Sequence, residues 1–383
     1  MSYIFDKTPD RRGTHSFKWD TCDADVVPLW VADMDFPCPE PITIALQRRL
    51  AHPVYGYTAG SRDHTEAITG WLDRRFQWAV KPDWLVPAPP GAIHAIDSMI
   101  TLFSEPGDEV ILQTPGYQPL SDVVTKQGRK VIENPLDNKS GRFTLDSNHL
   151  ESVISGRTRI LILCSPHNPT GRVWTLGELE ALLDICRRND ILVISDEVHA
   201  DLIYNGYRHC PLGSLARAGD RVVTVISPSK SFNTSGIPQS TLVIQNDQVR
   251  SDVRAYMDRA QLNLDSIFGS VAMIAAYNEC EDWLDDVMAY VQRNFATLET
   301  YLADNLPQLR VTRPEGTYLC WVDFRNIGKD QDELYGKMIR AGVRLSDGRD
   351  FGGEGVGYFR VNLACSEKTL LEGLKRLQAA LNS

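Results

Sequence analysis

The chain has 383 residues, a formal net charge of -10 and a pI near 5.3. It is longer than the roughly 250–300 residues at which a single hydrophobic core stops growing, so we expect one large and one smaller domain. The acidic balance argues against nucleic acid or an anionic membrane as the main partner and favours a small molecule. No window approaches the ~18 apolar residues of a transmembrane helix, and the eight cysteines form no C-x-x-C pair, which together predict a cytoplasmic protein.

The first part of the chain predicts an arm and two helices. Residues 1–45 combine turn-forming and aromatic residues, which is typical of a segment laid across the body of a protein. A helix follows, with Pro41 in its first turn. Residues 52–60 then form an aromatic, glycine-punctuated loop that contains Tyr57, and a second helical pattern begins near His64.

A proline-glycine turn near residue 90 precedes an amphipathic helix. Gly91 allows the tight turn, and the unpaired N–H groups of Ala92 and Ile93 at the helix start would attract an anion such as phosphate. A glycine before a helix is common, so this is weak evidence by itself. A strand is expected over residues 109–113, followed by Tyr117, which could either stack on a flat ligand or pack on the sheet edge.

Three apolar, β-branched runs farther along the chain predict buried parallel strands. The segment after the first run shows 3.6-residue periodicity, with Thr175 as N-cap and Glu178 completing a capping box. Strands that alternate with helices of this length predict right-handed βαβ units and an α/β fold with a mostly parallel sheet. The runs cover residues 159–164, 191–195 and 222–226.

Polar residues follow each of these three strands. Asn168 lies just past the first, Asp196 follows the second, and Lys230 follows the third together with Ser227 and Ser229. Because ligands of open α/β sheets bind outside the carboxyl ends of the strands, we expect these side chains to meet at one edge. Taken alone, the lysine would be a solvated loop residue, but the spacing of the other two residues favours a reactive amine.

The C-terminal third predicts helices over residues 247–305 and then a compact unit of strands and helices. The glycine-rich stretch 352–357 is followed by a strand rather than a helix, which argues against a dinucleotide site. Arg360 lies inside that strand and needs an anion, either a structural carboxylate or a bound one. The predicted units are an N-terminal arm that packs with the small domain (1–45), a large domain (46–280) and a small C-terminal domain (281–383).

Three motifs carry a resemblance to a known family. S-P-H-N-P-T-G, S-D-E-V-H and S-P-S-K-S-F-N, in this order and spacing, resemble the fold-type-I pyridoxal-phosphate enzymes of the aspartate aminotransferase superfamily. V-P-L-W-V-A-D-M-D-F at residues 27–36 is similar to the cystathionine beta-lyase and cystalysin-like carbon-sulfur lyases. The resemblance covers nearly the whole chain. It implies a parallel sheet sandwiched by helices, a smaller α+β C-terminal domain and a homodimer with active sites at the interface.

The resemblance also implies roles for the strand-end residues. Lys230 would bind the aldehyde of pyridoxal 5′-phosphate covalently and act as the catalytic base. Asp196 would keep the ring nitrogen protonated, Asn168 would donate to the phenolate oxygen, and Tyr117 would stack on the ring. Arg360 would bind the α-carboxylate of an amino-acid substrate. No metal ion is expected.

The same resemblance implies a phosphate cradle. Ser227, Ser229 and the backbone amides of Ala92 and Ile93 would hold the phosphate. The tyrosine that matches Tyr57 reaches across the dimer interface in the family, to the phosphate of the partner's cofactor.

Two departures from the aminotransferase pattern favour a lyase. His199 stands where aminotransferases usually carry a tyrosine, and Pro238 stands where they usually carry a phosphate-binding arginine. We expect His199 to lie near the cofactor through packing or a hydrogen bond rather than to act as an acid or base. The predicted function is β-elimination from L-cystathionine or a related S-substituted cysteine, which yields a thiol, pyruvate and ammonia. The alternatives are a class I or II aminotransferase and a ligand-sensing regulatory protein without turnover.

Overall fold

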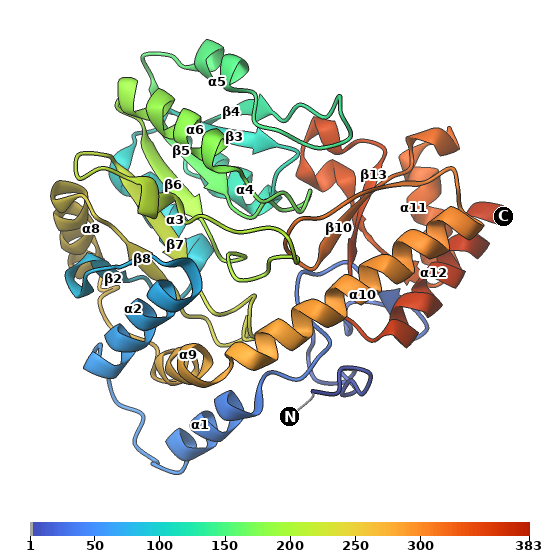
Figure 1. Ribbon diagram of the computed structural model, residues 1–383, viewed down its shortest axis with the longest axis horizontal. Helices are drawn as coiled ribbons and strands as arrows, with labels where there is room; N and C mark the ends of the chain where they lie inside the picture. Colours follow the sequence, from blue (N-terminus) through green and yellow to red (C-terminus); the bar gives the residue numbers. More distant parts are fainter. Residues whose placement is uncertain (1–2) are drawn as a thin grey trace.

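The computed structural model describes residues 3–383, and its largest element is a seven-stranded sheet. The strands lie in the order β2-β8-β7-β6-β5-β3-β4 (Figure 1), and β8 runs antiparallel to both of its neighbours while the others are parallel. The mostly parallel sheet predicted from the sequence is therefore confirmed. Its strands are β2 Leu85–Pro87, β3 Glu109–Thr114, β4 Lys130–Pro135, β5 Thr158–Cys164, β6 Leu192–Asp196, β7 Val222–Ile226 and β8 Thr241–Val243.

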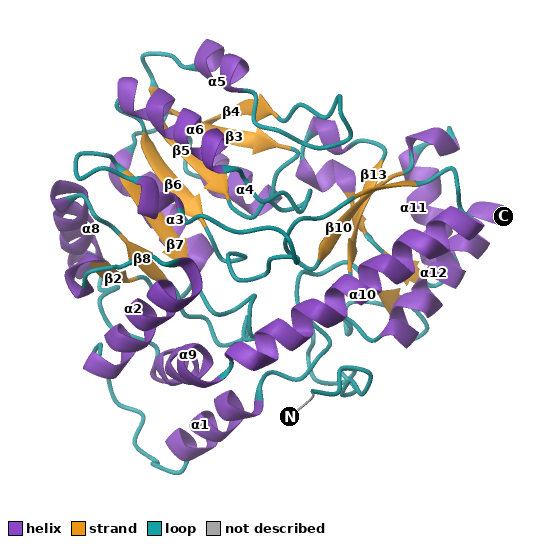
Figure 2. Ribbon diagram, viewed as in Figure 1, coloured by secondary structure: helices purple, strands orange, loops and turns teal. Residues whose placement is uncertain are grey.

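Helices cover both faces of this sheet (Figure 2), because the strands carry apolar side chains on both sides. In β3, Val110 and Leu112 pack into the core on one face, and Ile111 between them packs into the core on the other. The first face is covered by α3 Ala92–Phe103, α4 Gln118–Lys126 and α8 Asp247–Arg259. The second is covered by α5 Ser147–Val153, α6 Leu176–Arg188 and α7 Leu212–Leu215.

A second, antiparallel sheet forms the C-terminal part of the molecule, in the order β12-β13-β10-β9. The long helix α10 starts beside α9 and runs along the side of the molecule toward this smaller sheet (Figure 1). The strands are β9 Arg310–Thr312, β10 Leu319–Asp323, β12 Ser346–Asp347 and β13 Tyr358–Asn362, and the helices are α10 Glu281–Asn305, α11 Gln331–Arg340 and α12 Glu367–Asn382. The remaining helices are α1 Glu40–Leu50, α2 Arg62–Phe76 and α9 Ile267–Glu279, with short 3-10 turns η1 Pro82–Trp84, η2 Arg325–Ile327, η3 Gly348–Phe351 and η4 Gly353–Gly355.

The N-terminal segment crosses between the two sheets. Its strand β1, Val27–Pro28, pairs in parallel with β11, Val343–Arg344. Farther along, Asn362 Nδ2 donates to the carbonyl oxygens of Val31 and Asp33, at 2.6 Å each. From the other sheet, Asn233 donates to the carbonyl oxygens of Met34 and Phe36 at 3.1 and 2.8 Å. The domain boundaries at residues 45 and 280 stay a prediction.

Two further features bear on the sequence analysis. All eight cysteines are free. Within residues 3–383, every helix is too short or too polar to cross a bilayer. The cytoplasmic location stays a prediction.

The start of α6 shows how local sequence sets an element that supports the sheet. Thr175 accepts a hydrogen bond from the Glu178 backbone N–H, and the Glu178 carboxylate accepts one from the Thr175 N–H. This reciprocal capping box satisfies two donors that the helix itself leaves unpaired.

The Thr175→Ala substitution should lower the free energy of unfolding by about 1 kcal/mol, because the N-cap acceptor is lost. Thr175→Ser keeps a hydroxyl at the same place and should retain most of the stability. Urea unfolding followed by circular dichroism measures both changes. An equal loss in the two variants would mean that the methyl group of Thr175, rather than the cap, carries the effect.

Candidate active site

The candidate site lies where three neighbouring strands of the large sheet end. Strands β5, β6 and β7 are adjacent and parallel, and their last residues are in register, with Cys164 opposite Asp196 and Asp196 opposite Val225. The sheet therefore brings Asp196 and the segments that carry Asn168 and Lys230 to the same edge, as the sequence predicted.

A cavity of about 290 Å³ opens at this edge. Seven of the residues predicted from the sequence line it: Ala92, Ile93, Tyr117, Asp196, Ser227, Ser229 and Lys230. Asn168, His199, Arg360 and Tyr57 are not among its lining residues. The cavity also contains His94, Ser235 and Gln239, which the sequence analysis missed. For His94 a signal was present, because it follows Ala92 and Ile93 in the first turn of α3.

One end of the cavity suits a phosphate. Helix α3 begins at Ala92, and no side chain caps its first N–H groups, so they and the positive end of the helix dipole are available to an anion. On the opposite wall, Ser227 Oγ donates to the Gln239 carbonyl oxygen at 2.6 Å and accepts from the Ser229 N–H at 3.2 Å. Pro238 lines the cavity here, so no guanidinium stands at the position where aminotransferases usually carry arginine.

Asp196 also lines the cavity and is only 4% exposed. Its carboxylate accepts one long hydrogen bond, from the Val198 N–H at 3.4 Å. Burial raises the pKa of Asp196 to about 6, against smaller opposing effects of that hydrogen bond and of the positive charge on Lys230. A buried carboxylate that lacks a close cation suits a protonated ring nitrogen.

Lys230 is partly buried, and its amine is hydrogen-bonded to the N-terminal segment. Its Nζ donates to the Ala32 carbonyl oxygen at 2.7 Å, and the same oxygen accepts from the Tyr318 hydroxyl at 3.0 Å. The pKa of Lys230 is lowered to about 8, mainly by burial. The Arg360 charge acts in the same direction, and the Asp33 charge opposes the change. A neutral amine, which is the nucleophilic form, is therefore accessible near physiological pH.

Arg360 and Asn168 lie in direct contact. Arg360 Nη1 donates to Asn168 Oδ1 at 2.9 Å, and Nη2 donates to the Trp30 carbonyl oxygen at 2.7 Å and to Ser346 Oγ at 3.1 Å. The Nε atom is buried and has no partner in the described part of the chain. Burial lowers the pKa of Arg360 to about 10.

Arg360 lines a second cavity of about 220 Å³, which adjoins the first because Tyr117 and Lys230 line both. Its other walls include Trp30 and Phe351, and the Arg360 guanidinium lies 4.9 Å from the ring centre of Phe351. An amino acid held by its carboxylate at Arg360 would therefore present its α-carbon next to the lysine.

His199 is buried behind these groups. Its ring packs edge-on against Tyr318, with the ring centres 5.9 Å apart, and its Nδ1 has no hydrogen-bond partner among residues 3–383. Burial lowers the pKa of His199 to about 3, helped by the charges of Lys230 and Arg360. The imidazole is therefore neutral at physiological pH and cannot donate a proton as an imidazolium.

Tyr57 lies apart from the other predicted site residues. Its side chain is 96% exposed and does not line either cavity. Its predicted role at the phosphate of a partner subunit stays a prediction.

The Asp196→Asn substitution should stabilise the cofactor-free protein at alkaline pH. Because the folded pKa of Asp196 is raised from 3.8 to about 6, ionisation costs folding free energy as the pH rises through this range, up to about 3 kcal/mol. The variant should therefore unfold at higher urea than the wild type at pH 8 and close to it at pH 4. Asp304→Asn, which changes an exposed carboxylate, serves as the control. If Asp196→Asn gained no stability over the wild type between pH 4 and pH 8, the raised pKa of Asp196 would be contradicted.

Comparison with known proteins agrees with this geometry. The model of the family Aminotransferase class I and II matches residues 25–377. Cystathionine beta-lyase PatB of Bacillus subtilis (strain 168) is 38% identical over 386 residues, covering 99% of this chain and 100% of that protein.

Solved structures match over the same length. Cystalysin from Treponema denticola, which contains a pyridoxal 5′-phosphate cofactor, has a TM-score of 0.95 and 34% identity, covering 100% of this chain and 99% of that chain. The pyridoxal-phosphate-bound C-S lyase from Staphylococcus hominis has a TM-score of 0.93 and 30% identity, covering 99% of both chains. The chain therefore belongs to the class I and II aminotransferase family.

Proposed function

We propose that the protein is a pyridoxal-phosphate-dependent carbon–sulfur β-lyase that converts L-cystathionine or a related S-substituted cysteine into a thiol, pyruvate and ammonia. The observation that carries this proposal is the position of Lys230, an amine with a lowered pKa, on the shared wall of two cavities, of which one suits a phosphate and the other a carboxylate. The similarity to cystathionine beta-lyase PatB over the full length supports the choice of reaction.

The residues present fit the cofactor. Pyridoxal phosphate supplies an aldehyde that binds amines and a protonated ring that withdraws electrons from the α-carbon of a bound amino acid. The first N–H groups of α3, with Ser227 and Ser229, bind the phosphate in this proposal. Asp196 would accept the hydrogen bond of the ring nitrogen, and Tyr117 would pack on the ring. Asn168 would donate through its amide N–H, because its oxygen already accepts from Arg360.

Substrate orientation falls to Arg360. Its guanidinium is fixed by Asn168, the Trp30 carbonyl and Ser346, so little side-chain freedom remains to be lost when a carboxylate binds. The unpartnered Nε is buried, and a carboxylate would supply the missing acceptor.

Proton transfer falls to Lys230. In its neutral form, Nζ removes the proton from the α-carbon, and the electrons of that C–H bond then expel the thiolate from the β-carbon. The unsaturated amino acid that remains takes up one water and yields pyruvate and ammonia. His199 adds no positive charge beside the lysine, because its low pKa leaves it neutral.

The alternative is an aminotransferase, which the family also contains. Both reactions would begin with the same proton transfer from the α-carbon to Lys230. They would differ in the next step, because an aminotransferase transfers the amino group whereas a lyase expels a thiolate from the β-carbon. A regulatory protein that senses a ligand without turnover would not need Lys230, Asp196 and Arg360 together.

Incubation of the purified holoprotein with L-cystathionine should release equal amounts of thiol and pyruvate. Lys230→Ala should lower this rate at least about 1000-fold, because both the amine that binds the aldehyde and the base are lost. The exposed Lys375→Ala is the matched control and should keep wild-type activity. Glutamate formation from a 2-oxo acid acceptor, with no thiol release, would instead identify an aminotransferase, and full activity of Lys230→Ala would refute the catalytic assignment.

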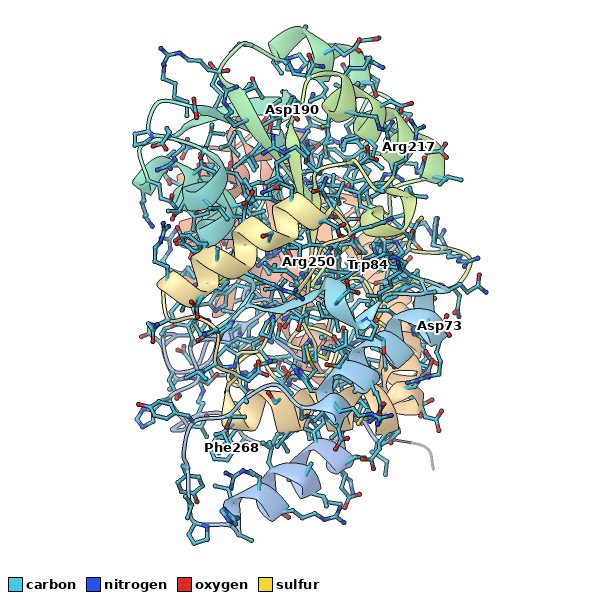
Figure 3. The ribbon with its side chains drawn as sticks, turned by 90° about the vertical axis from the view of Figure 1, so that its left-hand side faces the viewer. Asp73, Trp84, Asp190, Arg217, Arg250 and Phe268 are labelled. Carbon is cyan, nitrogen blue, oxygen red and sulfur yellow. The ribbon has the colours of Figure 1, made fainter. Side chains whose placement is uncertain are left out.

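We propose further that the active unit is a homodimer in which Tyr57 completes the phosphate site of the partner. The loop between α1 and α2 exposes Val54, Tyr55 and Tyr57, and an isolated chain rarely exposes a cluster of such large apolar residues. The Tyr55 ring lies 6.0 Å from Phe268 of α9, at the lower edge of the molecule in Figure 3. This loop and the start of α9 would therefore form part of the interface.

A complementation experiment tests the shared site. Neither Lys230→Ala nor Tyr57→Ala homodimers contain an intact site, but a mixed dimer contains one site with both residues and one with neither. Equal mixing of the two unfolded variants, followed by refolding, should restore about one quarter of wild-type activity, above the sum of the separate variants. Activity no higher than that sum would show that Tyr57 acts within its own chain or not at all.

A further inference from the structure

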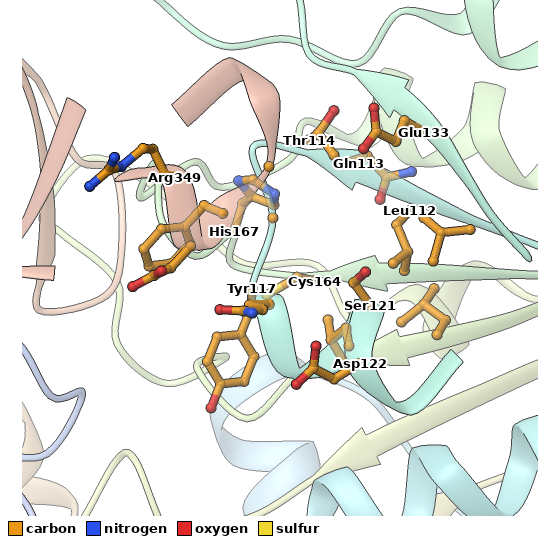
Figure 4. A pocket seen from close by; sticks show the side chains of 18 residues that line it. Leu112, Gln113, Thr114, Tyr117, Ser121, Asp122, Glu133, Cys164, His167 and Arg349 are labelled. Atoms are coloured by element: carbon orange, nitrogen blue, oxygen red, sulfur yellow. The ribbon is translucent and has the colours of Figure 1, made fainter. Parts of the chain in front are cut away.

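A third cavity, of about 220 Å³, lies beyond Tyr117 and beneath α4 (Figure 4). Its floor is formed by strands β3, β4 and β5, through residues such as Leu112, Glu133 and Cys164. Helix α4 contributes Ser121 and Asp122, and the small-domain segment 349–352 closes it from the other side. Its volume is far above the roughly 10–15 Å³ that a single water needs, so it can hold a molecular fragment.

This cavity adjoins the cavity of Arg360. Tyr117, Gln118, Asp350 and Phe351 line both of them. Beside these shared residues, the Gly116 N–H donates to the Phe351 carbonyl oxygen at 2.7 Å and so joins the segment after β3 to η3. A group attached to the β-carbon of an amino acid held at Arg360 therefore has a second chamber beside it.

The charged residues of the cavity are mainly acidic. Asp122, Glu133 and Asp350 contribute carboxylates. Its one guanidinium, that of Arg349, is already paired with two other aspartates, Asp332 at 2.6 Å and Asp347 at 2.7 Å.

Its remaining titratable groups are neutral. Burial lowers the pKa of His167 to about 3 and raises the pKa of the Cys164 thiol. Asp122 is already paired with Lys126 at 3.0 Å, whereas Glu133 and Asp350 have no salt-bridge partner among residues 3–383. An anion would therefore meet two unpaired carboxylates in this cavity, and a cation would pair with them.

Two residues that line the cavity, Gln113 and Thr114, have buried polar groups without a hydrogen-bond partner in the described part of the chain. The Gln113 side chain is 4% exposed and that of Thr114 is 6% exposed. Neither the Gln113 amide nor the Thr114 hydroxyl has a hydrogen-bond partner within residues 3–383. Leaving such groups buried and unpaired costs about 1–3 kcal/mol each, which a bound polar molecule would relieve. Leu112, Leu120 and Ile162 supply an apolar wall beside them.

We infer that this cavity receives the leaving-thiol arm of the substrate, and that it favours an arm with a short carbon chain ending in an ammonium group over one ending in a carboxylate. The inference rests on the proposed lyase function, for which it names the preferred substrate class. Asp350 lies on the wall that this cavity shares with the Arg360 cavity, and Glu133 lies on the β4 wall, where it is exposed to solvent.

The test compares two substrates of similar length and opposite charge, S-(2-aminoethyl)-L-cysteine and S-(carboxymethyl)-L-cysteine. Because their thiols differ as leaving groups, the deciding quantity is how the ratio of the two kcat/KM values changes between wild type and variant. Glu133→Gln and Asp350→Asn should each lower the ratio of amine to carboxylate substrate about tenfold, mainly through KM. Asp304→Asn, which removes an exposed carboxylate far along α10, should leave the ratio unchanged.

A second variant tests occupancy without reference to charge. Ser121→Phe places a ring beneath α4 and should lower kcat/KM for S-(2-aminoethyl)-L-cysteine at least fivefold more than for S-methyl-L-cysteine, whose arm is too short to reach the cavity.

Two results would overturn the inference. One is a ratio of amine to carboxylate kcat/KM that stays within twofold of wild type in both charge variants, and the other is an equal effect of Ser121→Phe on the long and the short substrate. In either case, pyruvate release would still support the lyase. Absence of pyruvate from every S-substituted cysteine, the methyl compound included, would overturn the proposed function and this inference with it.

Discussion

The burial of charged groups at the carboxyl end of a parallel sheet is the constraint on which this structure depends. Three such groups are poorly accessible to water: Asp196, Lys230 and Arg360. Burial raises the pKa of the aspartate and lowers the pKa of the lysine and the arginine, so in each case it favours the neutral form. The large sheet can hold Asp196 and Lys230 there because strands β5, β6 and β7 are buried on both faces and in fixed register, while β13 of the smaller sheet carries Arg360. A cofactor with an aldehyde and a ring nitrogen would complement Lys230 and Asp196, and a substrate carboxylate would complement the unpartnered Nε of Arg360.

The N-terminal segment converts this edge into an enclosed site. Carbonyl groups of residues 30–34 accept hydrogen bonds from side chains of both sheets, among them Lys230 on one side and Arg360, Tyr318 and Asn362 on the other. These bonds supply donors to backbone oxygens of a segment that has little regular secondary structure. The same contacts fix the position of the Lys230 amine and the orientation of the Arg360 guanidinium. The N-terminal segment therefore positions these groups as well as covering them.

Three adjoining cavities divide the tasks of the proposed reaction. The first suits the cofactor, the second suits the α-carboxylate, and the third offers an acidic chamber to the group that leaves. Tyr117 lines all three, which makes it the wall on which cofactor, substrate and leaving group would meet. Selectivity for the thiol would then reside in α4 and the segment 349–352, away from the residues that perform the proton transfer. This separation would let the chemistry stay constant while the substrate changes.

The sequence by itself determined the strands, the helices and the grouping of Asn168, Asp196 and Lys230, because parallel strands buried on both faces have a strong local signal and must end at the same edge. It also marked Arg360, an arginine inside an apolar strand. Only the tertiary structure decided that the Ala32 carbonyl holds the lysine, that Tyr318 shares this acceptor, and that a chamber lies beyond Tyr117. These contacts join residues far apart in the chain, such as Lys230 and Ala32, which are 198 positions apart. No periodicity, cap or turn records such a contact, because it arises only when separately formed elements pack against one another.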